Sequence, residues 1–540
     1  MDKRRIGNAA VCAASLLAAA ATLLYYVFGP SLAYFHADCT DSLLWAQVTV
    51  ETGELLSPDF RYAALLPFGS PLWMVPVLKI FGYTMTAQQV SMAVFVLLFL
   101  AAAFWCFRTL RFSAAMAGSA TFVTAMLLSS SVKLREIMWE HTIYYSLSIL
   151  FILLLVPLTV RVTDCLNSPK NNRRELFRVA VFSALLWLLC LGCGMDGVQV
   201  TVITVVPVAG AWLLQVLLDG DRSLTDPRQR RTYVTVGVMA LGVVCGLVAL
   251  WIVTNGGEVK AGYENAFSRY DNFDHWGDNA DRFIPWFLSL CGVTAVPETP
   301  FVSLESVLTV IKLAAAWGIL LLPVVLLFRY RTLKHRTTKV MVLTHLVLSA
   351  ILLFLFICGF LSSAQWRLTP MVGTGIVTAI LAIRELFDGT TVQKRIAVVL
   401  AALFVTASIV NAVTVLKMPI TAGDNQAKIN VAKTLQASDC EYGYATFWNA
   451  QSLTLLSDSK VKAVPVQVDA NGWSIYHYQI RDAWLEPYAT ADRVFAVLTP
   501  SEYTALQNTA AYQQLVVEGA VAEDYPQDGF RVIIFNRDPF

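Results

Sequence analysis

The stretch YFHADCTDSLLWAQ, Tyr34–Gln47, follows the first long apolar run of the chain and places a histidine and two aspartates within six positions. Carboxylates beside a membrane face are costly unless they are hydrated, paired or functional. Two interpretations are open at this point. Asp38 and Asp41 mark the end of a membrane span and cap a helix that starts at Ser42, or they belong to a functional site.

The chain is far more apolar than a soluble protein. Of its 540 residues, 56% are hydrophobic and only 14% are charged, whereas soluble domains carry about 25% charged residues. Apolar runs of at least about 18 residues, long enough to cross a bilayer core, recur along the chain. These features predict an α-helical polytopic membrane protein. The net charge of +2 gives no global basic field, so we expect no nucleic-acid partner.

Eleven apolar windows are candidate membrane spans. The first follows MDKRR and is interpreted as a retained anchor, because its apolar run is longer than that of a usual signal peptide. The windows lie near residues 9–29, 87–107, 114–131, 142–160, 179–194, 198–218, 233–254, 306–328, 340–361, 368–384 and 396–416.

Basic residues predict the orientation of these spans, because cytoplasmic loops are rich in Lys and Arg. With the N-terminus in the cytoplasm, the inside segments hold 22 Lys and Arg, and the outside loops before residue 417 hold 8. We therefore expect a multi-pass protein of the plasma membrane, with loops 30–86 and 255–305 and everything after about residue 417 outside the cytoplasm.

The segment 417–540 differs in character from the rest of the chain. Strand-like stretches such as EYGYATFW and RVFAVLT alternate in it with helix-like ones such as INVAKTLQAS and PSEYTALQNTAAYQQLV. Such alternation is typical of a small α/β domain. We therefore divide the chain into a transmembrane domain, 1–416, and a soluble extracytoplasmic domain, 417–540.

The first outer loop, 30–86, is predicted to contain a helix and an apolar segment. SLLWAQVTVETGEL reads as a short amphipathic helix, apolar at Leu44, Val48 and Leu55, that would lie in the membrane interface. The segment SPDFRYAALLPFGSPLWMVPVLKIFG follows it and is apolar, but it is too broken by proline to span the membrane.

In these features the sequence resembles the GT-C class of membrane glycosyltransferases, in particular its protein-mannosyltransferase and aminoarabinose-transferase branch. The first loop of that branch has a pattern of the type D-E-x-x-Y-A, then a glycine, a proline and an aromatic residue. Here the matching stretches are Asp41–Ala46, Thr52–Glu54 and Pro58–Tyr62. The resemblance implies that Asp41 is the catalytic aspartate and that the donor is a sugar on a polyprenyl phosphate.

The match has two departures. Ser42 stands where the pattern has its second acidic residue, and Asp38 lies three positions upstream of Asp41. The lysine that some relatives carry before a double proline is replaced here by the stretch LLPFGSP. Contact with the donor phosphate would then fall to Arg61 or to another basic residue.

A second acidic cluster, LREIMWEHTIYY, lies at the predicted start of the fourth span. It carries Arg135, Glu136, Glu140 and His141. Relatives similarly place an acidic residue here, which implies a catalytic role for Glu140 beside the first-loop aspartates. Glu136 and Glu140 would share one face if the segment is helical. The alternative is a solvated helix start at which glutamate is favoured by the helix dipole.

Recognition of a lipid-linked phosphate would need a basic group near the outer leaflet. Arg367, in SSAQWRLTPMVG, matches an arginine and a proline that relatives often carry there. The guanidinium fork suits phosphate oxygens, although an arginine at this depth also snorkels to the interface. Lys312 is the other candidate, with snorkelling favoured. The substrate-binding candidates are therefore Arg367, His141, His36, Arg61 and Arg135.

Two further ligand hypotheses are open. A divalent metal ion held by Asp38, Asp41, Glu140 and His141, with His36 nearby, would suit carboxylate and imidazole chemistry. The loop AGYENAFSRYDNFDHWGDNADRF interleaves aromatic and acidic residues that could contact a sugar, although a solvated loop is the simpler interpretation.

Together these features predict an enzyme that moves a sugar from a polyprenyl-phosphate donor to an acceptor outside the membrane, with Asp41 as general base. The alternatives are a transporter or flippase for lipid-linked saccharides and a non-catalytic scaffold of a cell-envelope complex. Transporters usually show repeated halves and broken helices in corresponding positions. The sequence shows no such repeat.

Overall fold

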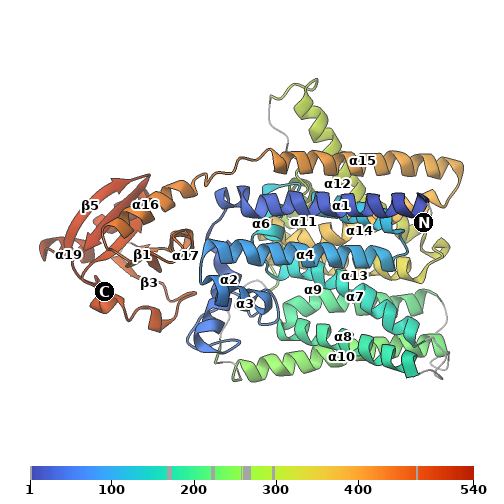
Figure 1. Cartoon of the computed structure of the whole chain (residues 1–540), viewed down its shortest axis with the longest axis horizontal. Coiled ribbons are helices and arrows are strands. Elements are labelled where there is room, and N and C mark those ends of the chain that lie inside the picture. Colours follow the sequence, from blue (N-terminus) through green and yellow to red (C-terminus); the bar gives the residue numbers. More distant parts are fainter. Residues whose placement is uncertain are drawn as a thin grey trace. The chain divides into compact units, whose positions relative to one another are not determined.

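The computed structural model describes residues 3–166, 173–219, 226–256, 258–259, 269–294, 298–469 and 472–540. The chain forms two compact units, both drawn in Figure 1. Unit 1 comprises Met1–Tyr25, Phe95–Leu250 and Asn265–Met418, and unit 2 comprises Tyr26–Val94, Trp251–Glu264 and Pro419–Phe540. The last junction between the units lies between Met418 and Pro419. The first loop, however, packs with the C-terminal segment, which its sequence did not indicate.

Among the described residues, ten helices are long and apolar enough to cross a membrane, or eleven when one bent pair is counted as a single span. The chain is a multi-pass membrane protein, and each predicted window corresponds to one of these spans. The ten helices are α1 (Lys3–Phe28), α4 (Met85–Thr109), α7 (Tyr144–Cys165), α8 (Arg173–Met195), α9 (Gly197–Leu218), α10 (Pro227–Val253), α12 (Leu304–Phe328), α13 (Arg336–Cys358), α14 (Thr369–Phe387) and α15 (Thr391–Leu416).

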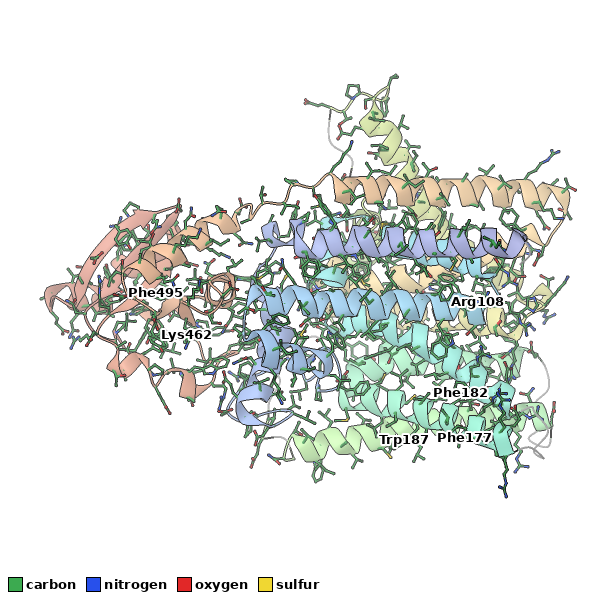
Figure 2. All side chains as sticks on the ribbon, in the orientation of Figure 1. Arg108, Phe177, Phe182, Trp187, Lys462 and Phe495 are labelled. Atoms are coloured by element: carbon green, nitrogen blue, oxygen red, sulfur yellow. The ribbon has the colours of Figure 1, made fainter. Side chains whose placement is uncertain are left out.

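Helices α8 and α10 approach each other closely because glycines line their contact. Gly242 and Gly246 lie four residues apart on α10; a Cβ atom at Gly242 would lie 2.7 Å from the carbonyl oxygen of Trp187. Small residues at this spacing allow two spanning helices to pack backbone against backbone. Helix α8 also carries exposed apolar side chains, such as Phe177, labelled in Figure 2. Such exposed apolar surface suits contact with lipid tails.

The third predicted span is broken. Helix α5 (Ala114–Leu127) is followed by the short helix α6 (Val132–Trp139), and the two axes differ by 115°. Ser131 begins α6, since its side chain accepts a hydrogen bond from the Leu134 amide. The prediction of a continuous span over 114–131 and a loop over 132–141 is therefore wrong in detail. Polar Ser129–Ser131 interrupts the apolar run and lets the chain turn.

Within unit 2, the first loop contains helices α2 (Ala37–Thr52) and α3 (Pro71–Phe81). Helix α2 begins earlier than predicted, with His36 at its N-cap position and no side-chain cap. Asp41 therefore lies in the second turn of α2, and the prediction that it caps a helix starting at Ser42 is wrong.

The single apolar face predicted for this helix is not observed. Every residue from Cys39 to Ala46 is buried, so this part of α2 has no exposed face. Leu55, predicted to lie on the apolar face, falls beyond the helix end and is 49% exposed. Because both sides of α2 are covered by protein, it acts as a structural element of unit 2.

The C-terminal part of unit 2 is a six-stranded mixed sheet with the order β3-β2-β1-β4-β6-β5. Strand β1 pairs in parallel with β2 and β4, and the other neighbours pair antiparallel. The predicted α/β character of the segment is confirmed. The strands are β1 (Tyr442–Thr446), β2 (Lys462–Asp469), β3 (Gly472–Ile475), β4 (Val494–Leu498), β5 (Val521–Gln527) and β6 (Phe530–Phe535).

Helices cover both faces of this sheet (Figure 1). On one face, Phe495 and Val497 of β4 pack in the core beneath α16 (Asn425–Ala437) and α17 (Phe447–Leu456). On the other face, Ala496 and Leu498 pack beneath α18 (Pro500–Gln507) and α19 (Ala510–Val517). Side chains of a strand alternate between the faces of a sheet, so β4, buried at all five positions, joins the two cores.

Candidate functional site

Asp41 is held by a residue from the C-terminal segment of unit 2. Its carboxylate oxygen Oδ1 accepts a hydrogen bond from Nε2 of Gln479 at 2.8 Å. Asp41 is 6% exposed and Gln479 is 2% exposed, so the pair is shielded from solvent. A buried carboxylate requires such partners because desolvation destabilises its charged form.

Trp45 fixes the orientation of the Gln479 amide. Its indole Nε1–H donates to Oε1 of Gln479 at 2.9 Å. Because an indole N–H only donates, the oxygen end of the amide must face Trp45 and the NH₂ end must face Asp41. Asp41 and Trp45 are four residues apart on α2, so one amide bridges two successive turns of the helix. The arrangement holds one carboxylate oxygen of Asp41 in a defined position.

The backbone of Gln479 is itself constrained. Its φ of 56° lies in the left-handed region that a residue with a Cβ atom rarely adopts. Its amide N–H donates to the carbonyl of Arg61 at 3.1 Å, and its own carbonyl accepts from Gln451 at 3.3 Å. These bonds stabilise a backbone conformation that directs the side chain toward Asp41.

Arg481 ties the same segment to the first loop of unit 2. Its guanidinium bonds Glu51 through Nη1 at 2.8 Å and Asp59 through Nε at 2.9 Å. Burial opposes the charge of the Asp59 carboxylate, but the hydrogen bond and charge of Arg481 outweigh it and lower the pKa of Asp59. Trp484 adds a bond from its indole to Glu51 at 2.7 Å. Neither Gln479 nor Arg481 was identified from the sequence, because no local pattern in HYQIRD distinguishes them.

The other first-loop candidates have less defined environments. Asp38 lies in the first turn of α2, three residues before Asp41 and therefore on a neighbouring part of the helix surface. His36 occupies the N-cap position of the same helix. Arg61 contributes its carbonyl to the Gln479 backbone, whereas its side chain is exposed. The catalytic role of Asp38 and the binding roles of His36 and Arg61 stay predictions.

The second acidic cluster lies in unit 1, on α6 and the turn that follows it. Arg135, Glu140 and His141 are all buried, at 5%, 3% and 7% exposure. Glu140 is the C-cap residue of α6, with a φ of −127°, and its amide still donates to the carbonyl of Glu136 at 3.1 Å. The two glutamates therefore lie one turn apart at the end of the helix, and a shared face for their side chains stays a prediction. Glu136 binds Lys133 at 2.6 Å.

Arg367 lies in the short 3-10 helix η5 (Gln365–Leu368) of unit 1 and is 7% exposed. Its Nη1 donates to the carbonyl of Phe360 at 2.6 Å. The neighbouring Trp366 has its ring 4.8 Å from the Lys133 ammonium of α6. Unit 1 thus brings the segment of Arg367 beside the helix that carries Arg135 and Glu136. A snorkelling arginine keeps its charged group in water, whereas the Arg367 side chain is buried.

The residues predicted to hold a metal divide between the two units, Asp38 and Asp41 in unit 2 and Glu140 and His141 in unit 1. In the part of the chain that the structure describes, no three His, Cys, Asp or Glu side chains form a group suited to a metal ion. A divalent metal therefore stays a prediction without a described site.

The acidic and aromatic loop is described only from residue 269 onward, and Tyr263 lies outside the described residues. Asp271 accepts hydrogen bonds from His275 at 2.9 Å and Asn279 at 3.1 Å, at the start of α11 (Trp276–Leu290). Its carboxylate therefore stabilises a helix start. Tyr270 and Phe273 are more than 70% exposed, at 73% and 74%, which agrees with the solvated-loop interpretation.

No model of a known protein family matches the sequence, and no curated protein matches it. Several solved structures, however, are similar to this chain. ArnT from Cupriavidus metallidurans bound to undecaprenyl phosphate aligns with a TM-score of 0.56 and 12% identity, covering 96% of this chain and 97% of that one. The archaeal oligosaccharyltransferase AglB from Archaeoglobus fulgidus, in complex with an inhibitory peptide and a dolichol-phosphate, aligns with a TM-score of 0.48 and 10% identity, covering 98% and 74%.

The similarity to ArnT extends over nearly the whole of both chains and shows a shared fold. ArnT is a GT-C glycosyltransferase. The chain therefore has a fold of the GT-C type, with a C-terminal sheet region, and the resemblance predicted from the first loop is confirmed at the level of the fold. No comparison assigns a role to an individual residue of this chain.

Proposed function

We propose that this protein is a glycosyltransferase that moves a sugar from a polyprenyl-phosphate donor to an acceptor outside the cytoplasm. The observation that carries the proposal is the buried Asp41 carboxylate, held by Gln479 at 2.8 Å in a chain with the fold of ArnT. A membrane scaffold would have no need for a buried carboxylate whose hydrogen-bond partner is itself oriented. A transporter would be expected to place such groups on broken helices of repeated halves.

In the proposed reaction, an acceptor hydroxyl or amine attacks the anomeric carbon of the donor sugar. The bond between that carbon and the phosphate oxygen breaks, and its electron pair leaves with the polyprenyl phosphate. Asp41 takes the proton that the acceptor loses, as a general base. Arg367 stabilises the negative charge that grows on the leaving phosphate.

The remaining predicted residues have supporting roles in this proposal. Asp38 and Glu140 orient the acceptor or hold a divalent metal ion, which would supply further positive charge to the phosphate. His36, Arg61, Arg135 and His141 bind substrate. The protein acts in the plasma membrane, where a lipid-linked donor arrives laterally, and its domains divide at about residue 417.

The direct test of the proposed function is release of the lipid phosphate. The full chain, in lipid nanodiscs, is incubated with a panel of undecaprenyl-phosphate-linked sugars and a cell-envelope extract. We expect one donor to yield free undecaprenyl phosphate and a glycosylated product in equal amounts. Movement of an intact lipid-linked saccharide across the bilayer, without cleavage, would support the transporter alternative.

Orientation gives a second prediction. Because Lys and Arg concentrate on the opposite side, single cysteines introduced at exposed Glu54 and Lys460 should react with an impermeant maleimide on intact cells. A cysteine at exposed Arg331 should react only after the cells are permeabilised. The unmodified chain measures the background from its native cysteines. Protection of both outer sites would contradict the topology and the mechanism that depends on it.

A third prediction tests Gln479 as a positioning residue. Glu is nearly isosteric with Gln and can still accept the Trp45 bond, but in Gln479→Glu a second carboxylate faces Asp41. Two close carboxylates cannot easily both ionise, so a pKa of the pair should rise above its ordinary value. The base is then protonated at a higher pH, and the acid limb of the pH–rate profile should move upward by at least about one unit.

Gln479→Leu provides the matched control for that experiment. Leucine removes the hydrogen bond that favours the ionised carboxylate but adds no charge, so the acid limb should move upward by less than in Gln479→Glu. Profiles unchanged from the unmodified protein in both variants would mean that Gln479 supports the fold rather than the protonation of Asp41.

A further inference from the structure

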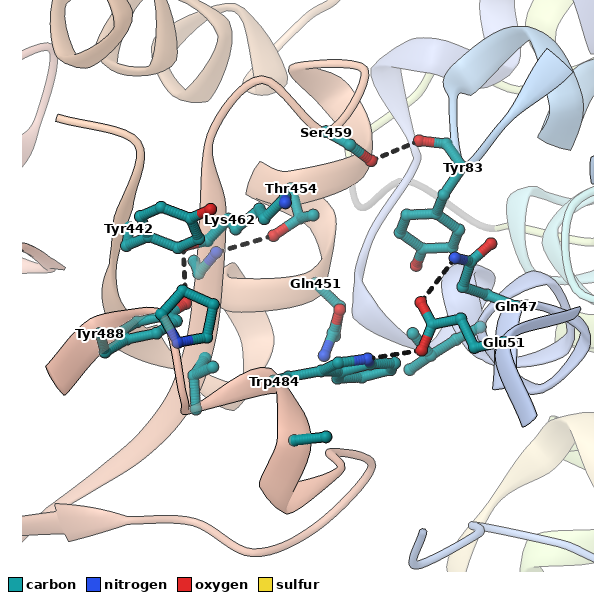
Figure 3. Close-up of a pocket in the computed structure, with 15 residues that line it drawn as sticks. Gln47, Glu51, Tyr83, Tyr442, Gln451, Thr454, Ser459, Lys462, Trp484 and Tyr488 are labelled. Atoms are coloured by element: carbon teal, nitrogen blue, oxygen red, sulfur yellow. Dashed lines mark hydrogen bonds between the residues drawn. The ribbon is translucent and has the colours of Figure 1, made fainter. Parts of the chain in front are cut away.

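Unit 2 contains a pocket of about 370 Å³ whose first wall is α2. Leu44, Gln47 and Glu51 line it (Figure 3). These residues follow Asp41 at intervals of three and four positions, so all four lie along one stripe of the helix. The pocket therefore begins one helical turn beyond the proposed general base.

Tyr83, which follows α3, also lines the pocket (Figure 3). Its carbonyl accepts a hydrogen bond from the hydroxyl of Ser459, another residue of the pocket lining. This bond holds the first loop against the C-terminal segment at the edge of the pocket.

The opposite wall comes from the sheet, from α17 and from the loop that carries Gln479. It presents aromatic rings from Tyr442, Trp484 and Tyr488 and polar groups from Gln451 and Lys462. Figure 3 shows Trp484 directed toward Glu51, to which its indole donates, and Tyr488 bonded to the carbonyl of Lys462. The rings of Trp484 and Tyr488 are therefore fixed before any ligand enters.

The charges at the pocket are largely satisfied. Glu51 accepts bonds from Gln47, Arg481 and Trp484, so its carboxylate is neutralised. The ammonium of Lys462 lies 5.3 Å from the Tyr442 ring centre, and it has no ion pair among the described residues. A ligand in the pocket would therefore meet aromatic faces, glutamine amide groups and one exposed cation, that of Lys462.

We infer that this pocket binds a sugar ring of the acceptor and presents one of its nucleophilic groups to Asp41. The inference rests on the proposed function and names the substrate class of the same site. A sugar combines a C–H face, which packs on aromatic rings, with hydroxyl groups, which pair with amides. The volume lies at the small end of the range for ligand sites, about 300–1,000 Å³, and suits one or two sugar rings.

The test measures binding of sugars to the full chain in nanodiscs, without glycoside detergents, by saturation-transfer NMR. The probes are methyl glycosides of neutral hexoses, N-acetylhexosamines and hexuronic acids. We expect saturable binding of at least one probe and a loss of roughly tenfold in affinity in Trp484→Ala, the worth of one aromatic contact. Trp448→Ala is the matched control, because Trp448 belongs to the same unit, is 59% exposed and does not line the pocket.

The outcomes separate this inference from the proposed function. In transfer assays, Trp484→Ala should raise the acceptor KM and leave kcat nearly unchanged. Absence of binding by every probe, or equal losses in Trp484→Ala and Trp448→Ala, would overturn the pocket assignment while transfer activity could persist. Displacement of the bound glycoside by an undecaprenyl-phosphate-linked sugar would assign the pocket to the donor and overturn the acceptor assignment. Binding without release of lipid phosphate would support the sugar site and contradict the proposed transfer.

Discussion

Asp41→Asn should lower the transfer rate by about 10²–10⁴-fold, the usual contribution of a general base. The substitution should leave the fold intact, because the asparagine oxygen can still accept the bond from Gln479 Nε2 that Asp41 accepts at 2.8 Å. What it removes is the ability to take a proton. The measurement is release of undecaprenyl phosphate under saturating donor, together with the affinity for the donor, which should change little.

Asp38→Asn is the control for that experiment. Asp38 lies one turn earlier on the same helix, so its loss should cost less if Asp41 alone is the base. If the two carboxylates share a metal ion, both variants should fail and a chelator should reproduce the loss in the unmodified protein. Full transfer activity in Asp41→Asn would overturn the catalytic assignment of Asp41 and leave the assignment of the fold unchanged. A capping role no longer offers an explanation, since α2 begins at Ala37.

The membrane spans could be predicted from the sequence because they depend on a local property. An apolar run long enough to cross a bilayer has few other stable arrangements in a membrane protein. The break between α5 and α6 was missed because a window average hides a short polar interruption. The start of α2 was misplaced for a similar reason: aspartate favours N-cap positions, and tertiary burial overrode that preference at Asp41.

The partners of Asp41 could not be predicted in this way. Gln479 lies 438 positions from Asp41 along the chain, and no periodicity connects two such distant segments. The first loop showed which carboxylate to suspect, because its pattern resembles a known class. The residue that orients the carboxylate came only from the fold, as did the aromatic wall beside it.

Arg367→Ala should reduce transfer by about 10²–10³-fold, the effect of removing one group that stabilises charge in a transition state. If the guanidinium acts mainly on the leaving phosphate, kcat should fall more than the affinity for the donor. Arg367→Lys should recover part of the rate, because lysine keeps the charge but lacks the planar fork that matches phosphate oxygens. The measurements are kcat and KM for the lipid-linked donor and the Kd for undecaprenyl phosphate.

A structural role must be separated from this catalytic one, because Arg367 also donates to the Phe360 carbonyl at 2.6 Å. Removing that bond alone would lower the thermal midpoint and reduce the active fraction without changing the kinetics of molecules that remain folded. Lys312→Met removes the other predicted phosphate-binding cation, within α12, and should have a small effect. If Lys312→Met instead weakens undecaprenyl phosphate binding and Arg367→Ala does not, the phosphate belongs to Lys312. The charge at Arg367 would then serve to hold its own segment in place.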